Sequence, residues 1–147
     1  MELLYTAEAT ATGGRRAGRA RSADGELDVR IAPPKEVGGP GGATNPEQLF
    51  ATGYAACFQS SMQRFATGRK LDLSGSRITA RVGIGPLKSG GFGLAVALDL
   101  DAPQISRDEA VELMTRAHET CPYSRATRGN IDVTLTVRGA TIERLAA

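Results

Sequence analysis

The feature that most constrains the fold of this sequence is a long apolar segment that opens with a strong helix start at Asn45-Pro46-Glu47. Asparagine caps helices, proline suits the first turn, and glutamate there favours the positive end of the helix dipole. From this point to about Thr67, apolar residues occupy most of the helical circumference, which is typical of a largely buried helix. We therefore predict one long central helix around which the rest of the chain folds.

Shorter alternating segments surround this helix. Their alternation and the turn residues between them predict strands over 2–12, 15–22, 26–32, 76–85, 92–101 and 131–137. A second helix begins after Ser106, because Glu109 completes a capping box. It carries an inward stripe formed by Ala110, Met114, Ala117 and Cys121. The order is three strands, helix, two strands, helix and strand, which predicts an α+β fold in a single domain over residues 1–147.

Composition and charge exclude several classes of protein. The chain has 147 residues and no apolar run near the ~20 residues that span a bilayer, so we expect no membrane segment. Its start shows no basic region followed by an apolar stretch, which leads us to expect a cytoplasmic protein. A net charge of +2 does not indicate a nucleic-acid partner. Five arginines do gather near the start of the chain, at positions 15, 16, 19, 21 and 30, but no aromatic side chains alternate with them, so we expect a solvated face.

The two cysteines, Cys57 and Cys121, lie on the apolar faces of the two predicted helices, so they can meet in one interior. A buried free cysteine often serves only as a small apolar residue. Reactivity requires the thiolate, and a thiol with a pKa of about 8.5 is only a few per cent ionised at neutral pH. Cys57 lies too far from its helix start to use the dipole, which leaves an arginine as the natural activator.

Metal and cofactor chemistry find no support in the sequence. Zinc sites commonly use four Cys or His ligands, and one chain offers two cysteines and the single His118. His118 lies one turn from Cys121 and can polarise it, although a hydrogen-bonded or exposed histidine is the simpler interpretation. We expect neither a metal nor a cofactor.

Several blocks of sequence occur in an order and spacing that resemble a known family. They are Gly13-Gly14-Arg15, Ala43 to Phe50, Gly53 to Phe58, Cys121-Pro122-Tyr123-Ser124 and Ala126 to Val133. Together they resemble the organic hydroperoxide resistance proteins of the OsmC/Ohr superfamily, nearly end to end. The tail from Gly139 adds nothing to the likeness, and Arg16 stands where many members carry an acidic residue.

The resemblance implies a thiol peroxidase. In it Cys57 attacks an organic hydroperoxide and Cys121 resolves the product as a disulfide, while Arg15 and Glu47 serve the reactive sulfur. It further implies an intertwined homodimer, and reduction by lipoylated proteins. A broader OsmC-type peroxidase with another peroxide preference and a non-enzymatic redox sensor are the alternatives.

Two further expectations concern the geometry of the site. Ten residues separate Glu47 from Cys57, which is about 15 Å of helical rise, so either the helix breaks near Gly53 or Arg15 and Glu47 reach the sulfur of the other subunit. An apolar mouth would favour alkyl peroxides, by ~0.8 kcal/mol per buried methylene. The candidates for this mouth, which are equally well explained as core, are Phe50, Phe58, Met62, Phe92 and Leu94.

Overall fold

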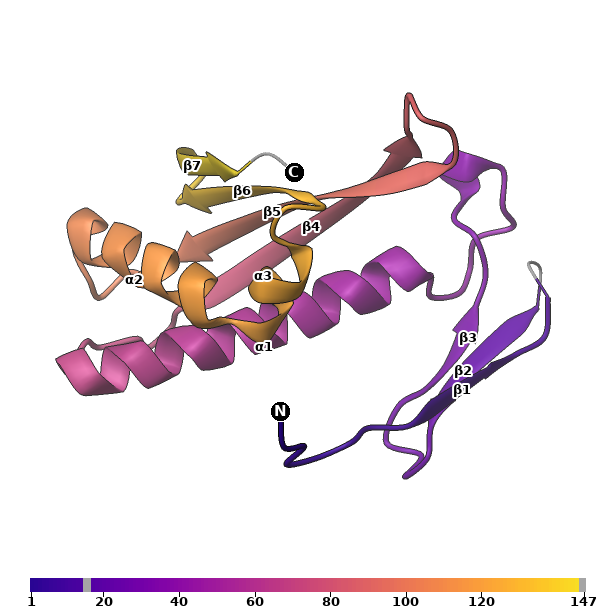
Figure 1. The fold of residues 1–147 in the computed structure, drawn as a ribbon, viewed down its shortest axis with the longest axis horizontal. Helices are drawn as coiled ribbons and strands as arrows, with labels where there is room; N and C mark the ends of the chain where they lie inside the picture. Colours follow the sequence, from indigo (N-terminus) through magenta and orange to yellow (C-terminus); the bar gives the residue numbers. More distant parts are fainter. Residues whose placement is uncertain (15–16, 146–147) are drawn as a thin grey trace. The chain divides into compact units, whose positions relative to one another are not determined.

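The computed structural model describes residues 1–14 and 17–145 of the chain (Figure 1). Its internal contacts divide it into two compact units, Met1–Leu49 and Phe50–Ala147. A single domain over residues 1–147 stays a prediction. The mixture of helices and antiparallel and parallel strands confirms the predicted α+β class.

The first unit contains a three-stranded antiparallel meander. Its strands are β1 (Ala9–Thr12), β2 (Gly18–Ser22) and β3 (Asp28–Ile31), each paired with the next. All three lie within predicted segments, although β1 covers only the end of its segment. Between β2 and β3 the chain turns where predicted, since the Asp24 carboxylate accepts hydrogen bonds from the Ser22 hydroxyl and the Glu26 amide. A short 3-10 helix, η1 (Lys35–Val37), follows β3.

The central helix α1 (Pro46–Arg69) begins where the sequence predicts. The Asn45 side chain accepts a hydrogen bond from the Gln48 amide at 2.9 Å, and the Gln48 side chain accepts one from the Asn45 amide at 3.3 Å. The helix continues without a break past Gly53. Within one chain its buried residues form a stripe that consists of Tyr54, Phe58, Ser61, Met62 and Ala66.

The second unit is built on a four-stranded sheet in the order β4-β5-β6-β7. Its strands are β4 (Arg77–Pro86), β5 (Phe92–Asp101), β6 (Asp132–Val137) and β7 (Ala140–Leu145). Strands β5 and β6 are parallel and the other pairs antiparallel. Parallel neighbours need a crossover connection. Helices α2 (Arg107–Thr120) and α3 (Pro122–Thr127) supply it.

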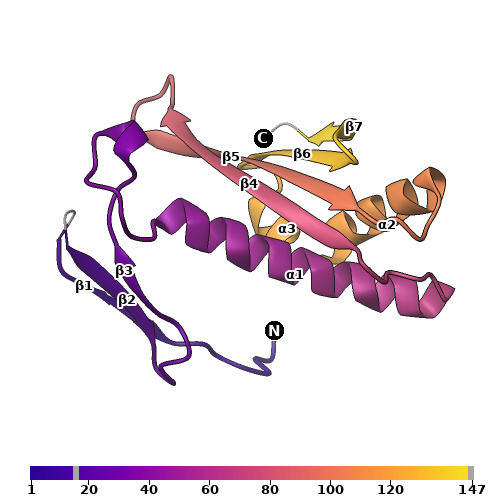
Figure 2. The same cartoon turned by 180° about the vertical axis from the view of Figure 1, so that it is seen from behind.

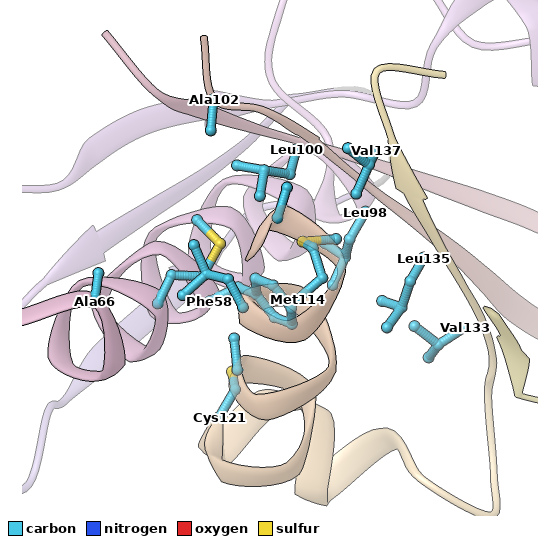
Figure 3. Close-up of a cluster of buried hydrophobic side chains, with 14 of the residues drawn as sticks. Phe58, Ala66, Leu98, Leu100, Ala102, Met114, Cys121, Val133, Leu135 and Val137 are labelled. Atoms are coloured by element: carbon cyan, nitrogen blue, oxygen red, sulfur yellow. The ribbon is translucent and has the colours of Figure 1, made fainter. Parts of the chain in front are cut away.

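The helices of this unit cover one face of the sheet, as Figures 1 and 2 show from opposite sides. Alternate residues of the strands point into the core they share, while the intervening residues are more exposed. This core contains Val96, Leu98, Leu100, Val133, Leu135 and Val137 from the sheet. Figure 3 shows Cys121 among these core side chains, which confirms its predicted inward position.

Helix α2 has the predicted capping box. The Ser106 amide donates to the Glu109 carboxylate at 2.8 Å, and the Glu109 amide donates to the Ser106 hydroxyl at 3.3 Å. The stripe predicted for this helix is also confirmed, since Ala110, Met114 and Ala117 are all buried. No helix in the described part of the chain is long and apolar enough to cross a membrane.

Candidate active site

The two cysteines meet between the helices of the second unit. Cys57 lies in the middle of α1 and Cys121 at the end of α2, and the Cys121 thiol donates to the Cys57 sulfur at an Sγ–Sγ distance of 3.4 Å. Cys121 is fully buried, whereas Cys57 is only partly so. The fold therefore brings together two thiols that are 64 positions apart, and only one of them is open to an incoming molecule.

Cys121 lies at a junction between two helices. It caps the C-terminus of α2, where its amide donates to the Ala117 carbonyl at 2.8 Å, and it is also the N-cap of α3. Pro122 cannot continue α2 but suits the first position of α3. This turn of the chain brings the Tyr123 amide to the Cys57 sulfur, where its hydrogen bond favours the thiolate.

The sequence predicts no helix after the one that carries Cys121, so α3 and the donor that it supplies were missed. A proline directly after an apparent helix end is the signal that was available, because proline is common at the first position of a new helix.

The described surroundings of Cys57 raise the pKa of its thiol above the ordinary value. Burial is the largest cause, because it disfavours the charged form. The Tyr123 amide lowers the pKa, the hydrogen bond and charge of Cys121 raise it, and the positive charge of Arg64 lowers it. The described residues on balance therefore favour the neutral thiol of Cys57.

An aromatic cluster adjoins the sulfur pair. The Tyr123 ring lies 6.1 Å from that of Phe50 in a stacked arrangement and 5.7 Å from that of Tyr54. The Tyr54 hydroxyl donates to Ser124 at 2.9 Å and lies 3.2 Å from the Thr127 hydroxyl. These contacts fix α3 against α1.

Gly53 permits the close approach of α3 to α1. A β-carbon added at Gly53 would lie 3.1 Å from the Tyr123 hydroxyl and 3.3 Å from its ring. A larger residue would therefore push Tyr123 away, and with it the amide that contacts Cys57.

The structure describes only one of the other two predicted catalytic residues. Arg15 falls outside the described residues. Glu47 is the second residue of α1 and is partly buried. Helix α1 has no break near Gly53. The alternative in which such a break brings Glu47 to the Cys57 of the same chain therefore finds no support.

The five residues predicted for an apolar mouth fall into three different settings. Phe50 is partly buried and stacks on Tyr123. Phe58 and Met62 are fully buried, which agrees with the alternative that they are core residues. Phe92 is 74% exposed at the start of β5, and Leu94 on the same strand is partly buried. Phe50 is thus the member of the set that contacts Tyr123, whose amide bonds to the Cys57 sulfur.

His118 is buried on α2, whereas the sequence led us to expect a hydrogen-bonded or exposed histidine; the exposed alternative is wrong. It is 5% exposed, and neither ring nitrogen has a hydrogen-bond partner among the described residues. Burial lowers the pKa of its imidazole, and the nearby Arg128 charge lowers it further, against a smaller opposite effect of Glu119. In residues 1–14 and 17–145, no three His, Cys, Asp or Glu side chains gather closely enough to hold a metal ion.

Comparison with known proteins shows the family to which the chain belongs. The family described as OsmC-like protein matches residues 39–136. The organic hydroperoxide resistance protein of Xanthomonas axonopodis pv. citri is 54% identical over 138 residues, which cover 92% of this chain and 96% of the relative. A crystal structure of an organic hydroperoxide resistance protein from Legionella pneumophila has a TM-score of 0.87 and 47% identity, and the match covers 92% of this chain and 98% of that one.

The chain belongs to the OsmC-like family and, within it, to the organic hydroperoxide resistance proteins. An OsmC-like protein from Mycoplasma pneumoniae shares the fold at a TM-score of 0.69 but only 18% of the sequence. The sequence is therefore much more similar to the hydroperoxide resistance branch than to this more distant member.

Proposed function

We propose that the protein is a cysteine-based peroxidase that reduces organic hydroperoxides to alcohols. The observation that carries this proposal is the sulfur pair, in which a partly exposed Cys57 lies 3.4 Å from a buried Cys121. An accessible thiol suits attack on a peroxide, and a buried partner in contact with it suits resolution of the product. The names of the relatives support the same substrate class.

The chemistry balances with these two thiols. The Cys57 thiolate attacks one oxygen of the hydroperoxide, the O–O bond breaks, and the alkoxide leaves as an alcohol after taking a proton. Cys57 now holds a sulfenic acid, which condenses with the Cys121 thiol to give a disulfide and water. A dithiol reductant then restores both thiols by exchange and becomes a disulfide itself. We propose a lipoylated protein as this reductant, as the family resemblance implies.

Arg15 is the proposed activator of Cys57. The described surroundings raise the pKa of the Cys57 thiol, mainly through burial, so the reaction needs a cation that stabilises the thiolate. The planar guanidinium of arginine offers several donors to the thiolate and to the oxygens that gain charge as the O–O bond breaks. In this proposal Glu47 orients that guanidinium.

We further propose that the protein is a homodimer in which Arg15 and Glu47 serve the Cys57 of the partner subunit. Glu47 and Cys57 lie ten positions apart on one unbroken helix, which is about 15 Å of rise. Large apolar side chains are also exposed in the single chain, among them Leu87 and Phe92 at the β4–β5 turn. Both features are accounted for by a second copy of the chain.

The proposed reaction is tested by stopped-flow oxidation with an alkyl hydroperoxide. We expect Cys57→Ser to lose the reaction completely and Arg15→Ala to react at least tenfold more slowly, since a guanidinium lost from a thiolate weakens both activation and charge stabilisation. Cumene hydroperoxide should react faster than hydrogen peroxide. Undiminished turnover in Cys57→Ser would falsify the proposal.

Subunit mixing tests whether the two residues act across the dimer. A hybrid of one Cys57→Ser subunit and one Arg15→Ala subunit keeps one intact site only if Arg15 serves the partner's sulfur. We expect the hybrid to regain about half of the wild-type rate, because one site of two is complete. A hybrid that is no faster than the Arg15→Ala homodimer would mean that Arg15 serves the Cys57 of its own subunit.

A further inference from the structure

A groove lies between α1 and α2 in the second unit, next to the cysteines. It has a volume of about 440 Å³ and is lined by Ser61, Arg64, Phe65, Arg69, Glu112, Arg116, Glu119 and Thr120. The Ser61 hydroxyl donates to the Cys57 carbonyl at 3.2 Å, and Thr120 directly precedes Cys121. The groove therefore begins within one helical turn of both cysteines.

The charges in this groove are not balanced. Arg69 binds Glu112 through two hydrogen bonds of 2.9 and 3.1 Å, and Arg116 pairs with Glu119 at 2.9 Å. These four charges cancel in pairs. Arg64 forms no ion pair with any residue in 1–14 or 17–145, and its side chain is exposed. The lining thus carries one uncompensated positive charge.

Arg64 and Cys57 lie on the same helix, α1. Residues 57 and 64 are seven positions apart, so they lie on the same face of α1, two turns from each other. Side chains on a helix lean toward its N-terminus, and Cys57 lies on the N-terminal side of Arg64. The positive charge of Arg64 accordingly favours the Cys57 thiolate.

We propose that Arg64 is a positioning residue that keeps a positive charge beside Cys57 from within the same subunit. This inference rests on the proposed role of Cys57 as the attacking thiol. Among the described residues, the other groups that act on the charge of Cys57 are Cys121 at the end of α2 and the Tyr123 amide of α3. Arg64 is the one cation among them, and in the proposed dimer it acts alongside Arg15 of the partner.

A consequence follows for anionic reagents. An uncompensated arginine in a groove beside the sulfur attracts a negatively charged molecule as it approaches, in addition to favouring the thiolate. A neutral reagent experiences only the second effect. Iodoacetate and iodoacetamide are alkylating agents of similar size, but iodoacetate is an anion and iodoacetamide is neutral. Comparing them therefore separates attraction of the reagent from stabilisation of the thiolate.

The test measures alkylation of Cys57 against pH in variants that all carry Cys121→Ser, so that a single thiol reacts. With Arg64→Gln, iodoacetamide should react about threefold more slowly below the thiol pKa, as expected for a partly solvated charge at this range. Iodoacetate should lose a further factor of about three, and about 0.5 M salt should abolish most of both losses. Arg64→Lys should restore both rates.

Arg81→Gln is the matched control, since it removes the charge of an exposed arginine on β4, outside the groove, and should leave both rates unchanged. Equal rates in Arg64→Gln and its parent at low salt, or no rescue by lysine, overturn the inference while leaving the proposed peroxidase intact. Peroxide turnover that survives Cys57→Ser instead removes the proposed function, whatever the alkylation rates show.

Discussion

The two cysteines occupy different kinds of helical structure. Cys57 lies in the middle of a 24-residue helix with regular structure on both sides, whereas Cys121 lies at the joint where α2 stops and α3 starts. A position within a long helix fixes the sulfur but offers it no free backbone donor, because every amide there is already used. The joint supplies the missing donor through Tyr123. Cys57 is thus fixed by its own helix and accepts its hydrogen bond from the segment that follows Cys121.

This comparison predicts that the wild type and Cys121→Ser differ strongly once Cys57 has attacked a hydroperoxide. With Cys121→Ser, Cys57 should react once with an alkyl hydroperoxide and then stall, because no thiol is left to form the disulfide. Excess peroxide should convert Cys57 to the irreversible sulfinic acid, which mass spectrometry of the intact protein detects. Sustained turnover in this variant with a dithiol reductant would show that Cys121 is not required for resolution.

The next largest effect concerns the contacts that hold the joint. Tyr54→Phe removes the hydroxyl that bonds to Ser124, whose side chain is fully buried. We expect the free energy of unfolding to fall by about 1–2 kcal/mol, since Ser124 loses a partner in the interior. Urea denaturation measures this change. Tyr5→Phe, at an exposed tyrosine of the first unit, is the control and should change stability by less than about 0.5 kcal/mol.

His118 gives a pH-dependent prediction for the helix that leads to the joint. In the folded protein, burial lowers the pKa of this imidazole below its ordinary value of 6.5. The unfolded chain therefore binds a proton first as the pH falls through 6.5, so acidification favours unfolding until the folded-state pKa is reached. His118→Leu removes this penalty and two buried nitrogens that lack partners among the described residues.

We expect His118→Leu to stabilise the protein by about 1 kcal/mol at pH 8, because a buried unpaired polar group is costly. The gain should increase between pH 7 and pH 5.5. Because His118 is the only histidine of the chain, the difference between the two pH profiles reports on it alone. Parallel profiles for the two proteins contradict the prediction.

The smallest effect compares two glycines of α1. Gly68 has open space around the position of an added β-carbon, so Gly68→Ala should stabilise the protein by about 0.5–1 kcal/mol through helix propensity. Gly53→Ala has the same propensity gain but meets the Tyr123 ring. It should therefore gain less stability and also slow the alkylation of Cys57. Equal behaviour of the two variants would mean that Tyr123 adapts without moving its amide.

Strong local signals made much of the fold predictable. The start of α1, the capping box of α2 and the alternation in β5 each depend on side chains close together in sequence, and each is confirmed. Strand β7 was missed because β6 reaches it through a tight two-residue turn at Arg138-Gly139. Both turn residues have positive φ, at 49° and 76°, which suits a hairpin turn. Arginine seldom adopts this conformation, so its sequence gives little warning.

The candidate site was also predictable only where the sequence carries a local signal. The residues alone supported two inward thiols, and the resemblance divided their roles. The sequence did not reveal the Tyr123 amide, because a backbone group has no residue signature and its direction depends on where α3 begins. Nor did it separate Phe50 from Phe58, since both are apolar residues of one helix and only packing distinguishes a partly buried residue that stacks on Tyr123 from one in the core.

The 64-position separation of the two cysteines also affects how long the protein survives. When the proposed disulfide forms, it closes a long loop and restricts the unfolded chain, which corresponds to about 4 kcal/mol in the chain-entropy view. The molecule is then most resistant to unfolding while it waits for its reductant. Under a burst of peroxide, the pool of spent protein would outlast heat and proteolysis better than the active pool, and would be ready for use again once reducing equivalents return.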